Sequence, residues 1–353
     1  MKKYQTPLTI LGILVAAAVG LYFAQFTSKQ IIATLIFLMI LCGTLFYWKF
    51  RLSFAFAGLS ILLATGLIDL PHLIEFAGLD IILFLVGMMA VIGVLEENNF
   101  FEFIVAKAVD RIGERPYFLM ASLMVLATFF AALVDEVTSI LFMMATMFHI
   151  CKRYKVHPAP FLLMIVFATN IGSSATAVGN PIGVMIALRA QLSFVDFLRW
   201  AAPISAVCLL VTIILSLLYF KAPLADLREK MRKKGNEPHE LEGVRYVMRD
   251  IRNCFFLFLA TVICLVLHHQ LEELLHLQKN TLLIGTALFF GSVAIFMKAN
   301  DARDFFMRRV DWWTLSFFLV LFASVGTLKY VGVTEQVAKG MIHVAGGGDV
   351  LLL

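Results

Sequence analysis

Residues 117–150 read YFLMASLMVLATFFAALVDEVTSILFMMATMFHI, and Asp135 and Glu136 are the only acidic side chains among these 34 residues. His149, near the end of the run, is the only basic one. An ionisable group at bilayer depth costs about 2.5–3.5 kcal/mol on insertion scales, so it normally faces a cavity or an ion path rather than lipid. The acid pair therefore indicates a functional position inside a membrane.

A second apolar run, residues 161–188, is interrupted by the sequence NIGSSATAVGNP from Asn170 to Pro181. The flanks Phe161–Thr169 and Ile182–Leu188 are each too short to cross a bilayer. We therefore expect residues 170–181 to be the unwound middle of one crossing. Irregular backbone at membrane depth is tolerated only where it lines a cavity or is buried in protein.

The oxygen-bearing and turn-forming residues of these two interruptions are the candidate ligands. Freed carbonyl and hydroxyl oxygens can replace the hydration shell of a small cation, and a half-helix N-terminus offers amides and a positive dipole end to an anion. The candidate substrate-binding and ion-binding residues are Asp135, Glu136, Thr138, Asn170, Gly172, Ser173, Ser174, Thr176, Gly179, Asn180 and Pro181.

The composition places both runs in a polytopic membrane protein with all-α transmembrane structure. Of the 353 residues 61% are hydrophobic and 15% charged, against roughly 45–50% and about 25% in soluble domains, and the mean hydropathy is +0.90. The five cysteines lack C-x-x-C spacing and are expected to be packing residues. The other expected crossings are Leu8–Phe26, Ile31–Trp48, Leu52–Ile68, Leu79–Leu95, Trp200–Phe220, Cys254–Leu267, Thr281–Met297 and Trp312–Leu328.

The distribution of basic residues predicts the topology. If residues 117–150 enter and leave on the same side, 23 of the 29 Lys and Arg residues fall on the side of the N-terminus. The positive-inside rule then places the N-terminus and the mixed-charge linker 221–252 in the cytoplasm. Val137–Ile150 has 14 residues, about 21 Å of helix against about 30 Å of hydrocarbon. This length favours a re-entrant hairpin over two short crossings.

The two halves of the chain resemble each other, and the predicted topology gives them opposite directions. The run from Asp80 to Leu95 can be laid on the run from Asp311 to Leu328. This is the inverted repeat of secondary transporters. Because the sequence stops at Leu353, we expect the second copy to be truncated, the alternative being that another chain supplies its missing part. We expect N-terminal scaffold helices in 1–78, a first repeat in 79–220 with hairpin 117–150 and broken helix 160–188, a cytoplasmic linker in 221–252 and a truncated second repeat in 253–353.

Structural explanations for the same residues remain open. The acid pair could be an ordinary turn outside the membrane that joins two helices. The small residues of the second interruption could form a helix-packing face, with Gly179 and Gly183 as a GxxxG pair.

Three strings resemble a known family: ALVDEVTS at 132–139, ATNIGSSATAVGNPIGVMI at 168–186 and VGMMAVIGVLEENNFFEF at 86–103. They are similar to signatures of the arsenical-pump and sodium/proton-antiporter permeases of the ion-transporter superfamily. That superfamily includes citrate-transporter-like domains and divalent-anion/sodium symporters. The resemblance implies a homodimeric, elevator-type transporter with ion sites at a hairpin and an unwound helix, including a possible sodium ion at Asp135, Thr138, Asn170 and Thr176.

The chain departs from the family pattern at two positions. Asp135 matches the acidic residue of the family's Leu-Asp-Asn-Val-Thr, but Glu136 replaces its Asn. Asn180-Pro181-Ile182-Gly183 stands where Asp-Pro-Pro-Asn is usual. One carboxylate has thus moved from the broken helix to the hairpin, which leaves the identity of the solute open.

The sequence predicts a secondary active transporter, not an enzyme, that couples sodium or protons to movement of a small inorganic or organic anion. Sodium/proton exchange without an anion is the nearest alternative, and an ion channel is the alternative of another class. We expect a multi-pass protein of the cytoplasmic membrane whose partners are the lipid bilayer, its solute and a second copy. No nucleic acid and no cofactor beyond the coupling ion are expected.

Overall fold

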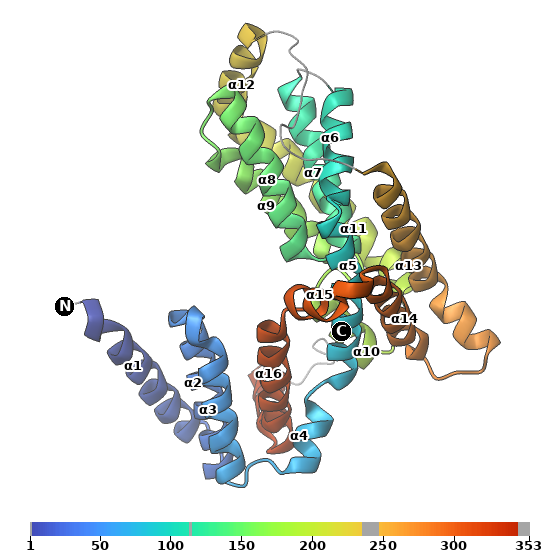
Figure 1. Cartoon of the computed structure of the whole chain (residues 1–353). Helices are drawn as coiled ribbons and strands as arrows, with labels where there is room; N and C mark the ends of the chain where they lie inside the picture. Colours follow the sequence, from blue (N-terminus) through green and yellow to red (C-terminus); the bar gives the residue numbers. More distant parts are fainter. Residues whose placement is uncertain (1, 113–114, 235–246, 345–353) are drawn as a thin grey trace. The chain divides into compact units, whose positions relative to one another are not determined.

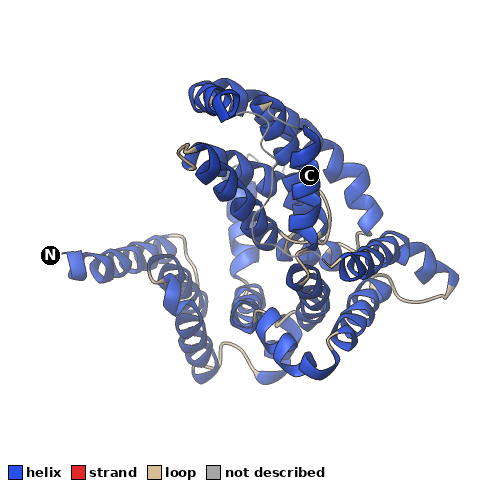
Figure 2. Cartoon of the chain, turned by 45° about the horizontal axis from the view of Figure 1, so that its top comes forward, coloured by secondary structure: helices blue, strands red, loops and turns tan. Residues whose placement is uncertain are grey.

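The computed structural model describes residues 2–112, 115–234 and 247–344, and the ordered elements in these ranges are all helices (Figure 2). Six helices are long and apolar enough to cross a membrane, and the bent pair of α14 (Thr281–Met297) and the segment 299–309 would make a seventh. The predicted all-α, polytopic membrane fold is confirmed. The six helices are α2 (Ser28–Phe46), α5 (Leu79–Glu97), α7 (Pro116–Leu133), α11 (Phe194–Tyr219), α13 (Met248–Leu274) and α16 (Trp312–Tyr330).

The remaining helices are shorter or more polar. The predicted crossing at Leu52–Ile68 contains a helix of only 14 residues, about 21 Å long. The apolar part of the first helix, Pro7–Phe23, is also shorter than a spanning helix. These elements are α1 (Lys2–Phe23), η1 (Trp48–Phe50), α3 (Arg51–Ala64), α4 (Leu70–Phe76), α6 (Phe100–Ile112), α8 (Glu136–Tyr154), α9 (Ala159–Ser173), α10 (Pro181–Arg189), α12 (Lys221–Lys234), η2 (Ala299–Asp301), α15 (Ala302–Arg309) and α17 (Val333–Val344).

The chain divides into two compact units. The first consists of Met1–Ile82 and Asp311–Leu353, and the second of Leu83–Val310. The first unit is built around an aliphatic core in which α2, α3 and α16 contribute Ile40, Leu62 and Val320, each at most 1% exposed. The second unit contains both interrupted runs, so the candidate site belongs to it.

Within the second unit an aromatic cluster fixes the hairpin formed by α7 and α8. The rings of Phe130 and Phe142 lie 5.1 Å apart across the break between the two helices. Phe101 of α6 stacks on Phe142 at 4.7 Å and meets Phe130 edge-on at 5.3 Å. All three rings are buried. Because aromatic pairs of this kind add to the energy of burial, the cluster holds α6 against both arms of the hairpin.

The order of the α-helices from α2 to α6 recurs from α13 to α17, and Figure 1 labels all of these helices except α17. The series α2 to α6 runs long helix, helix, short helix, 19-residue helix, amphipathic helix, and α13 to α17 follows the same order. In both series two residues join the fourth helix to the fifth, and the second of these residues has a positive φ, Asn99 at 52° and Gly332 at 80°. The sequence repeat is therefore also a repeat of local structure.

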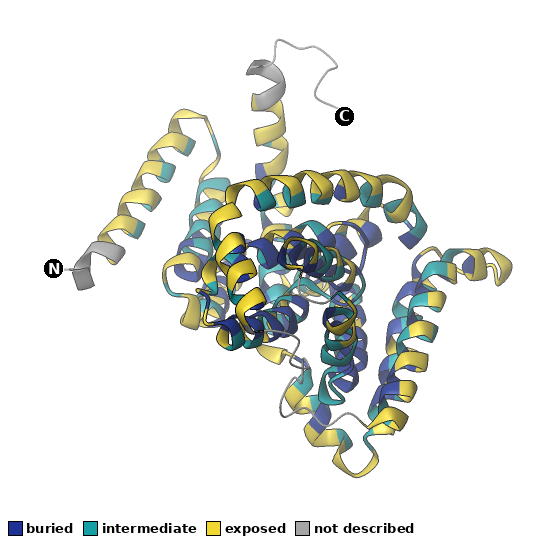
Figure 3. Cartoon of the chain, turned by 90° about the horizontal axis from the view of Figure 1, so that it is seen from above, coloured by how far each residue is buried: buried dark blue, intermediate teal, exposed yellow. Residues whose placement is uncertain are grey.

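The exposed surface of the spanning helices is apolar. Along α11 the side chains of Val207, Leu210, Ile214 and Leu218 are between 49% and 65% exposed, and Figure 3 shows exposed residues running along the outer faces of the helices. Soluble proteins rarely expose a continuous row of large aliphatic side chains along a helix. In a bilayer these side chains face lipid tails.

Part of the predicted linker and the end of the second repeat lie outside the described residues. Of the linker 221–252, the structure describes α12 and the start of α13, and residues 235–246 are not described. Residues 345–353, where the second copy was predicted to stop short, are also outside the described ranges.

Candidate functional site

The first interruption is a helix break at the predicted acid pair. The first arm, α7, ends at Leu133, and α8 begins at Glu136. Asp135 has extended backbone at φ −175° and caps α8, because its Oδ1 accepts a hydrogen bond from the backbone N–H of Thr138 at 2.8 Å. The helical hairpin is therefore present, with its turn at the predicted position.

The second arm of the hairpin is longer than predicted, so the prediction of its length is wrong. The second arm, α8, has 19 residues, about 28 Å at 1.5 Å per residue, and not 14. The helix continues past the apolar run because Lys152 and Arg153 occupy its last turn, where cations interact favourably with the helix dipole. Helix length thus does not separate a re-entrant hairpin from two crossings, and the re-entrant placement stays a prediction.

The second interruption is shorter than predicted. The helix α9 continues through Ser173, so the prediction that residues 170–173 are unwound is wrong. Residues 174–180 are not helical, and α10 begins at Pro181. Asn180 caps α10 as Asp135 caps α8: its Oδ1 accepts a hydrogen bond from the N–H of Gly183 at 2.7 Å. Pro181 suits the first helical position, where its missing N–H leaves no bond unmade.

The structure brings the two breaks into direct contact. The backbone N–H of Glu136 donates to the carbonyl of Gly179 at 3.2 Å, so the starts of α8 and α10 are joined. The Ser173 hydroxyl donates to Glu136 Oε2 at 3.1 Å. The buried Thr176 hydroxyl donates to the carbonyl of Ala132 at the end of α7. Three hydrogen bonds therefore link segments about forty residues apart in the sequence.

Two glycines allow this approach. A Cβ at Gly179 would lie 2.8 Å from the carbonyl oxygen of Ala131, closer than real side chains come. A Cβ at Gly172 would overlap the backbone of Thr128 on α7. At the same crossing the Thr128 hydroxyl donates to the carbonyl of Ala168 at 2.9 Å. The helix-packing explanation is thus correct for Gly172, while Gly179 lies in the unwound segment itself.

We call the contact between the starts of α8 and α10 the junction. Not every candidate residue faces it. The Asn170 side chain is exposed and donates to the carbonyl of Val166 on its own helix at 2.8 Å. Of the four residues expected around sodium, Asp135 and Thr138 are hydrogen-bonded to each other through the cap, and Thr176 contacts the end of α7. Asn170 is turned away from this group.

The remaining candidate, Ser174, lies on the other side of the unwound segment. It is exposed, and its hydroxyl donates to the carbonyl of Ile171 at 2.8 Å. The same hydroxyl lies 3.4 Å from that of Ser205 on α11. The unwound segment is thus flanked by the hairpin and by α11.

The junction combines positive helix ends with negative side chains. Both half-helices begin there, and each N-terminus carries a partial positive charge of roughly half an elementary charge. Asp135 and Glu136 are half-buried at these helix ends. The helix ends stabilise carboxylates or a bound anion, and the carboxylates attract a cation or proton. The arrangement can therefore hold a cation and an anion close together.

Sequence reasoning missed a group of charges beside the junction. The Glu96 carboxylate, at the end of α5, interacts electrostatically with Asp135 and with the Thr138 side chain. Arg309 Nη1 lies 3.0 Å from Glu96 Oε2, and its Nε lies 3.1 Å from Glu97 Oε1. The only sequence signal for this charged group was the acidic pair Glu96-Glu97, which directly follows the apolar run 79–95.

A lysine completes this charge cluster and ties it to a helix bend. Lys298 Nζ lies 2.9 Å from Glu97 Oε2. Lys298 follows α14 directly, at the break where the chain bends by 111°. The cluster of Glu96, Glu97, Lys298 and Arg309 therefore connects the end of α5 to the bent segment and places it next to the hairpin turn.

Several apolar helices of spanning length, together with two joined helix breaks, are typical of multi-pass membrane transport proteins. A comparison with protein families agrees with this class. The profile of the citrate transporter family, CitMHS, matches residues 44–353. The chain belongs to this family, which is a member of the predicted ion-transporter superfamily.

Curated relatives carry transporter or membrane-protein names. The chain is 31% identical over 272 residues to an uncharacterized transporter of Mycobacterium tuberculosis, covering 77% of this chain and 61% of the relative. It is 30% identical over 275 residues to the 46 kDa membrane protein of Mycobacterium leprae, with the same coverage. It is 26% identical over 343 residues to the P protein of Homo sapiens, covering 77% of this chain and 40% of that protein. The chain thus spans about three fifths of the length of the mycobacterial relatives.

Proposed function

We propose that the protein is a secondary active transporter that couples sodium or protons to movement of a small inorganic or organic anion. The description of the family names citrate, so a tricarboxylate is the first solute to test. The activity, substrate and coupling ion are proposals for the whole protein.

One observation carries the proposal: the hydrogen bond from the Glu136 N–H to the Gly179 carbonyl joins the starts of two half-helices beside two half-buried carboxylates. An anion bound at the helix ends is repelled by Asp135 and Glu136 until a cation or proton neutralises one of them. Occupancy by one ion therefore favours occupancy by the other. Mutual dependence of this kind is what couples two fluxes.

The two compact units suggest how access alternates. The unit Leu83–Val310 contains the hairpin, the broken helix and the charge cluster, whereas the other unit is an aliphatic bundle around α2, α3 and α16. We propose that the unit Leu83–Val310 carries the solute and that the other unit is the scaffold. The chain passes between them at residues 82–83 and 310–311.

The proposal is tested by flux in proteoliposomes. Radiolabelled citrate uptake is measured with a sodium gradient, a proton gradient, both or neither. We expect uptake only with one of the gradients, together with a fixed stoichiometry of the driving ion. Other di- and tricarboxylates and inorganic oxyanions are then tested as competitors.

Two other results would support one of the alternative functions. Exchange of sodium for protons without any anion dependence would favour the antiporter alternative. Current that flows without coupling between gradients would favour a channel.

The placement in the cell is part of the proposal. We propose a location in the cytoplasmic membrane with the N-terminus and the linker in the cytoplasm, as the distribution of basic residues predicts. We also propose the homodimer implied by the family resemblance. Light scattering on the purified protein measures its mass directly.

A further inference from the structure

A groove lies between α6 and the first turns of α13, and none of the candidate site residues lines it. It has a volume of about 470 Å³ and is lined only by apolar and basic side chains. Its apolar wall includes Phe103, Ile251 and Phe255. Nothing in the proposed transport mechanism uses this groove.

Three exposed cations line the groove: Lys107 and Arg111 of α6 and Arg252 of α13. None of the three makes an ion pair with another residue in the described part of the chain. The acidic residues Glu102 and Asp110 of α6 and Asp250 of α13 lie on the same helices, but none of them lines the groove. Among the described residues, the groove therefore presents three cations without an acidic partner beside an apolar wall.

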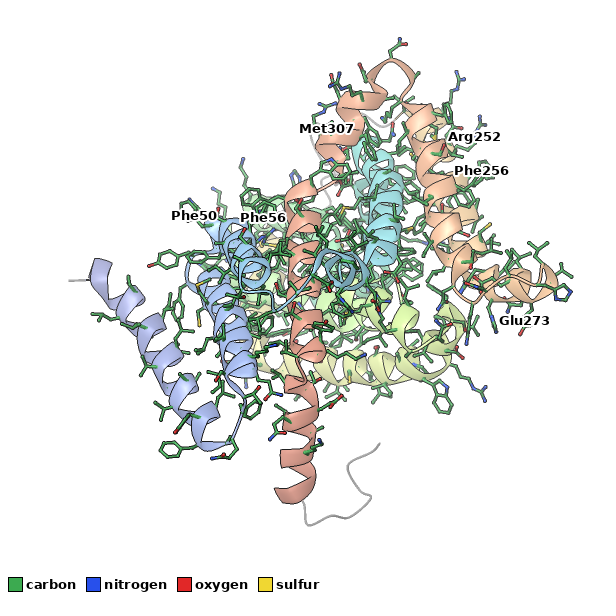
Figure 4. The ribbon with its side chains drawn as sticks, turned by 90° about the horizontal axis from the view of Figure 1, so that it is seen from below. Phe50, Phe56, Arg252, Phe256, Glu273 and Met307 are labelled. Carbon is green, nitrogen blue, oxygen red and sulfur yellow. The ribbon has the colours of Figure 1, made fainter. Side chains whose placement is uncertain are left out.

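The position of the groove along α13 matches a membrane interface. The helix has 27 residues, about 40 Å at 1.5 Å per residue, which exceeds the hydrocarbon thickness of about 30 Å. Figure 4 shows Arg252 towards one end of α13 and Glu273 towards the other. The apolar run begins at Cys254, directly after the basic end, so the groove spans the boundary between headgroups and hydrocarbon.

The two helices orient the groove along this boundary. Phe100, at the start of α6, lies 5.9 Å from Phe258, which follows Phe255 on α13. Arg111 is in the last turn of α6, and Arg252 precedes Phe255 on α13. The helices thus run in opposite directions, so that both bring their aromatic residues to one end and their cations to the other.

We infer that this groove binds an anionic phospholipid, with the headgroup phosphate at Lys107, Arg111 and Arg252 and an acyl chain against Phe103, Ile251 and Phe255. Basic clusters beside apolar surface at the cytoplasmic side of a membrane are typical binding sites for such lipids. A soluble anion would not use the apolar wall, and a zwitterionic lipid would leave the three cations unneutralised.

The test is native mass spectrometry of the full chain, delipidated in detergent and titrated with phosphatidylglycerol or phosphatidylcholine of the same chain length. The wild-type protein retains phosphatidylglycerol preferentially. The triple variant Lys107→Gln, Arg111→Gln, Arg252→Gln binds it on the order of a hundredfold more weakly, from roughly a fivefold loss per basic residue. Equal retention of both lipids by the wild type, or unchanged retention by the triple variant, overturns the inference.

A control triple variant separates the groove from general surface charge. Arg228→Gln, Arg232→Gln and Arg303→Gln remove the same charge from exposed positions that do not line the groove. This control retains phosphatidylglycerol as the wild type does. If it loses the lipid as the groove variant does, the attraction is a diffuse property of the surface and the inference fails.

A third variant tests the apolar wall while keeping all three cations. Ala108 lines the groove, and Ala108→Trp fills it; Ala108→Leu is the milder form if elution or melting shows that the first variant misfolds. Both are expected to lower lipid retention. Unchanged retention, together with equal binding of glycerol phosphate, would assign a soluble anion instead. Loss of a dimer in the triple variant, without loss of lipid, would assign the groove to a second copy.

Discussion

The cap and the charge of Asp135 can be separated by two substitutions. Its Oδ1 accepts the N–H of Thr138 at 2.8 Å at the start of α8. Asn caps helices as well as Asp does, whereas replacement of such a cap by Ala costs about 1 kcal/mol. We therefore expect Asp135→Asn to unfold at or slightly above the wild-type midpoint and Asp135→Ala to be less stable than Asp135→Asn by about 1 kcal/mol.

The negative charge of Asp135 affects stability and transport separately from the cap. Asp135 interacts unfavourably with the neighbouring Glu96 carboxylate, so Asp135→Asn relieves a like-charge contact and keeps the cap. The asparagine variant should nevertheless lose coupled uptake, because it can no longer neutralise a cation or carry a proton at the junction. Stability and transport should therefore separate in this one variant.

The assay combines thermal unfolding in detergent, followed by tryptophan fluorescence, with citrate uptake in proteoliposomes. Asn180→Ala is the matched control for the second cap, which accepts the Gly183 N–H at 2.7 Å, and it should lose about 1 kcal/mol of stability. The reasoning is refuted in one of two ways. If Asp135→Asn destabilises as much as Asp135→Ala, the charge is structural, and if it transports as the wild type does, the charge is not part of the mechanism.

Three further predictions follow from the packing, from burial and from the topology. Gly172→Ala should lower stability by about 1–3 kcal/mol through overpacking, whereas Gly285→Ala, whose Cβ would meet nothing closer than 3.9 Å, should not; equal melting points would contradict the tight crossing. Burial raises the pKa of the Glu102 carboxyl. Stability should therefore fall as the pH rises from about 4.3 through that raised value, and Glu102→Gln should flatten this profile in melts at several pH values; an unchanged slope would exclude the group. In a background without native cysteines, Lys152→Cys should react with an impermeant maleimide only from the cytoplasm and Lys279→Cys only from outside; the reverse pattern would overturn the topology.

Several features of the fold could be predicted because they depend on local sequence. An apolar run of spanning length forms a helix in lipid, since every backbone group must find a partner within the segment. A charged pair, or a glycine and proline inside such a run, therefore marks a break. Each break has a local capping pattern: Asp135 stands three positions before Thr138, and Asn180 stands three positions before Gly183. Both caps are present. The likeness of the run from Asp80 to Leu95 to the run from Asp311 to Leu328 was visible for the same reason.

Helix ends were less predictable than helix breaks. The sequence placed the end of α8 where the apolar run stops and the unwinding of the second run at its first polar residue. In the structure α8 extends to Tyr154 and α9 extends to Ser173. Polar residues continue a helix when their side chains bond the preceding turn, as Asn170 does with the carbonyl of Val166.

Local sequence patterns were therefore sufficient to predict the class of protein and the two places where its helices break. The contact between these breaks, the orientation of Asn170 and the position of Glu96 and Arg309 beside the hairpin turn became known only from the packing of the helices. The physical reason is that local pattern reports whether a segment is apolar and where it bends. Contact between segments about forty residues apart depends on how closely α7 and α9 approach, and that distance is set by packing at Gly172 and Thr128.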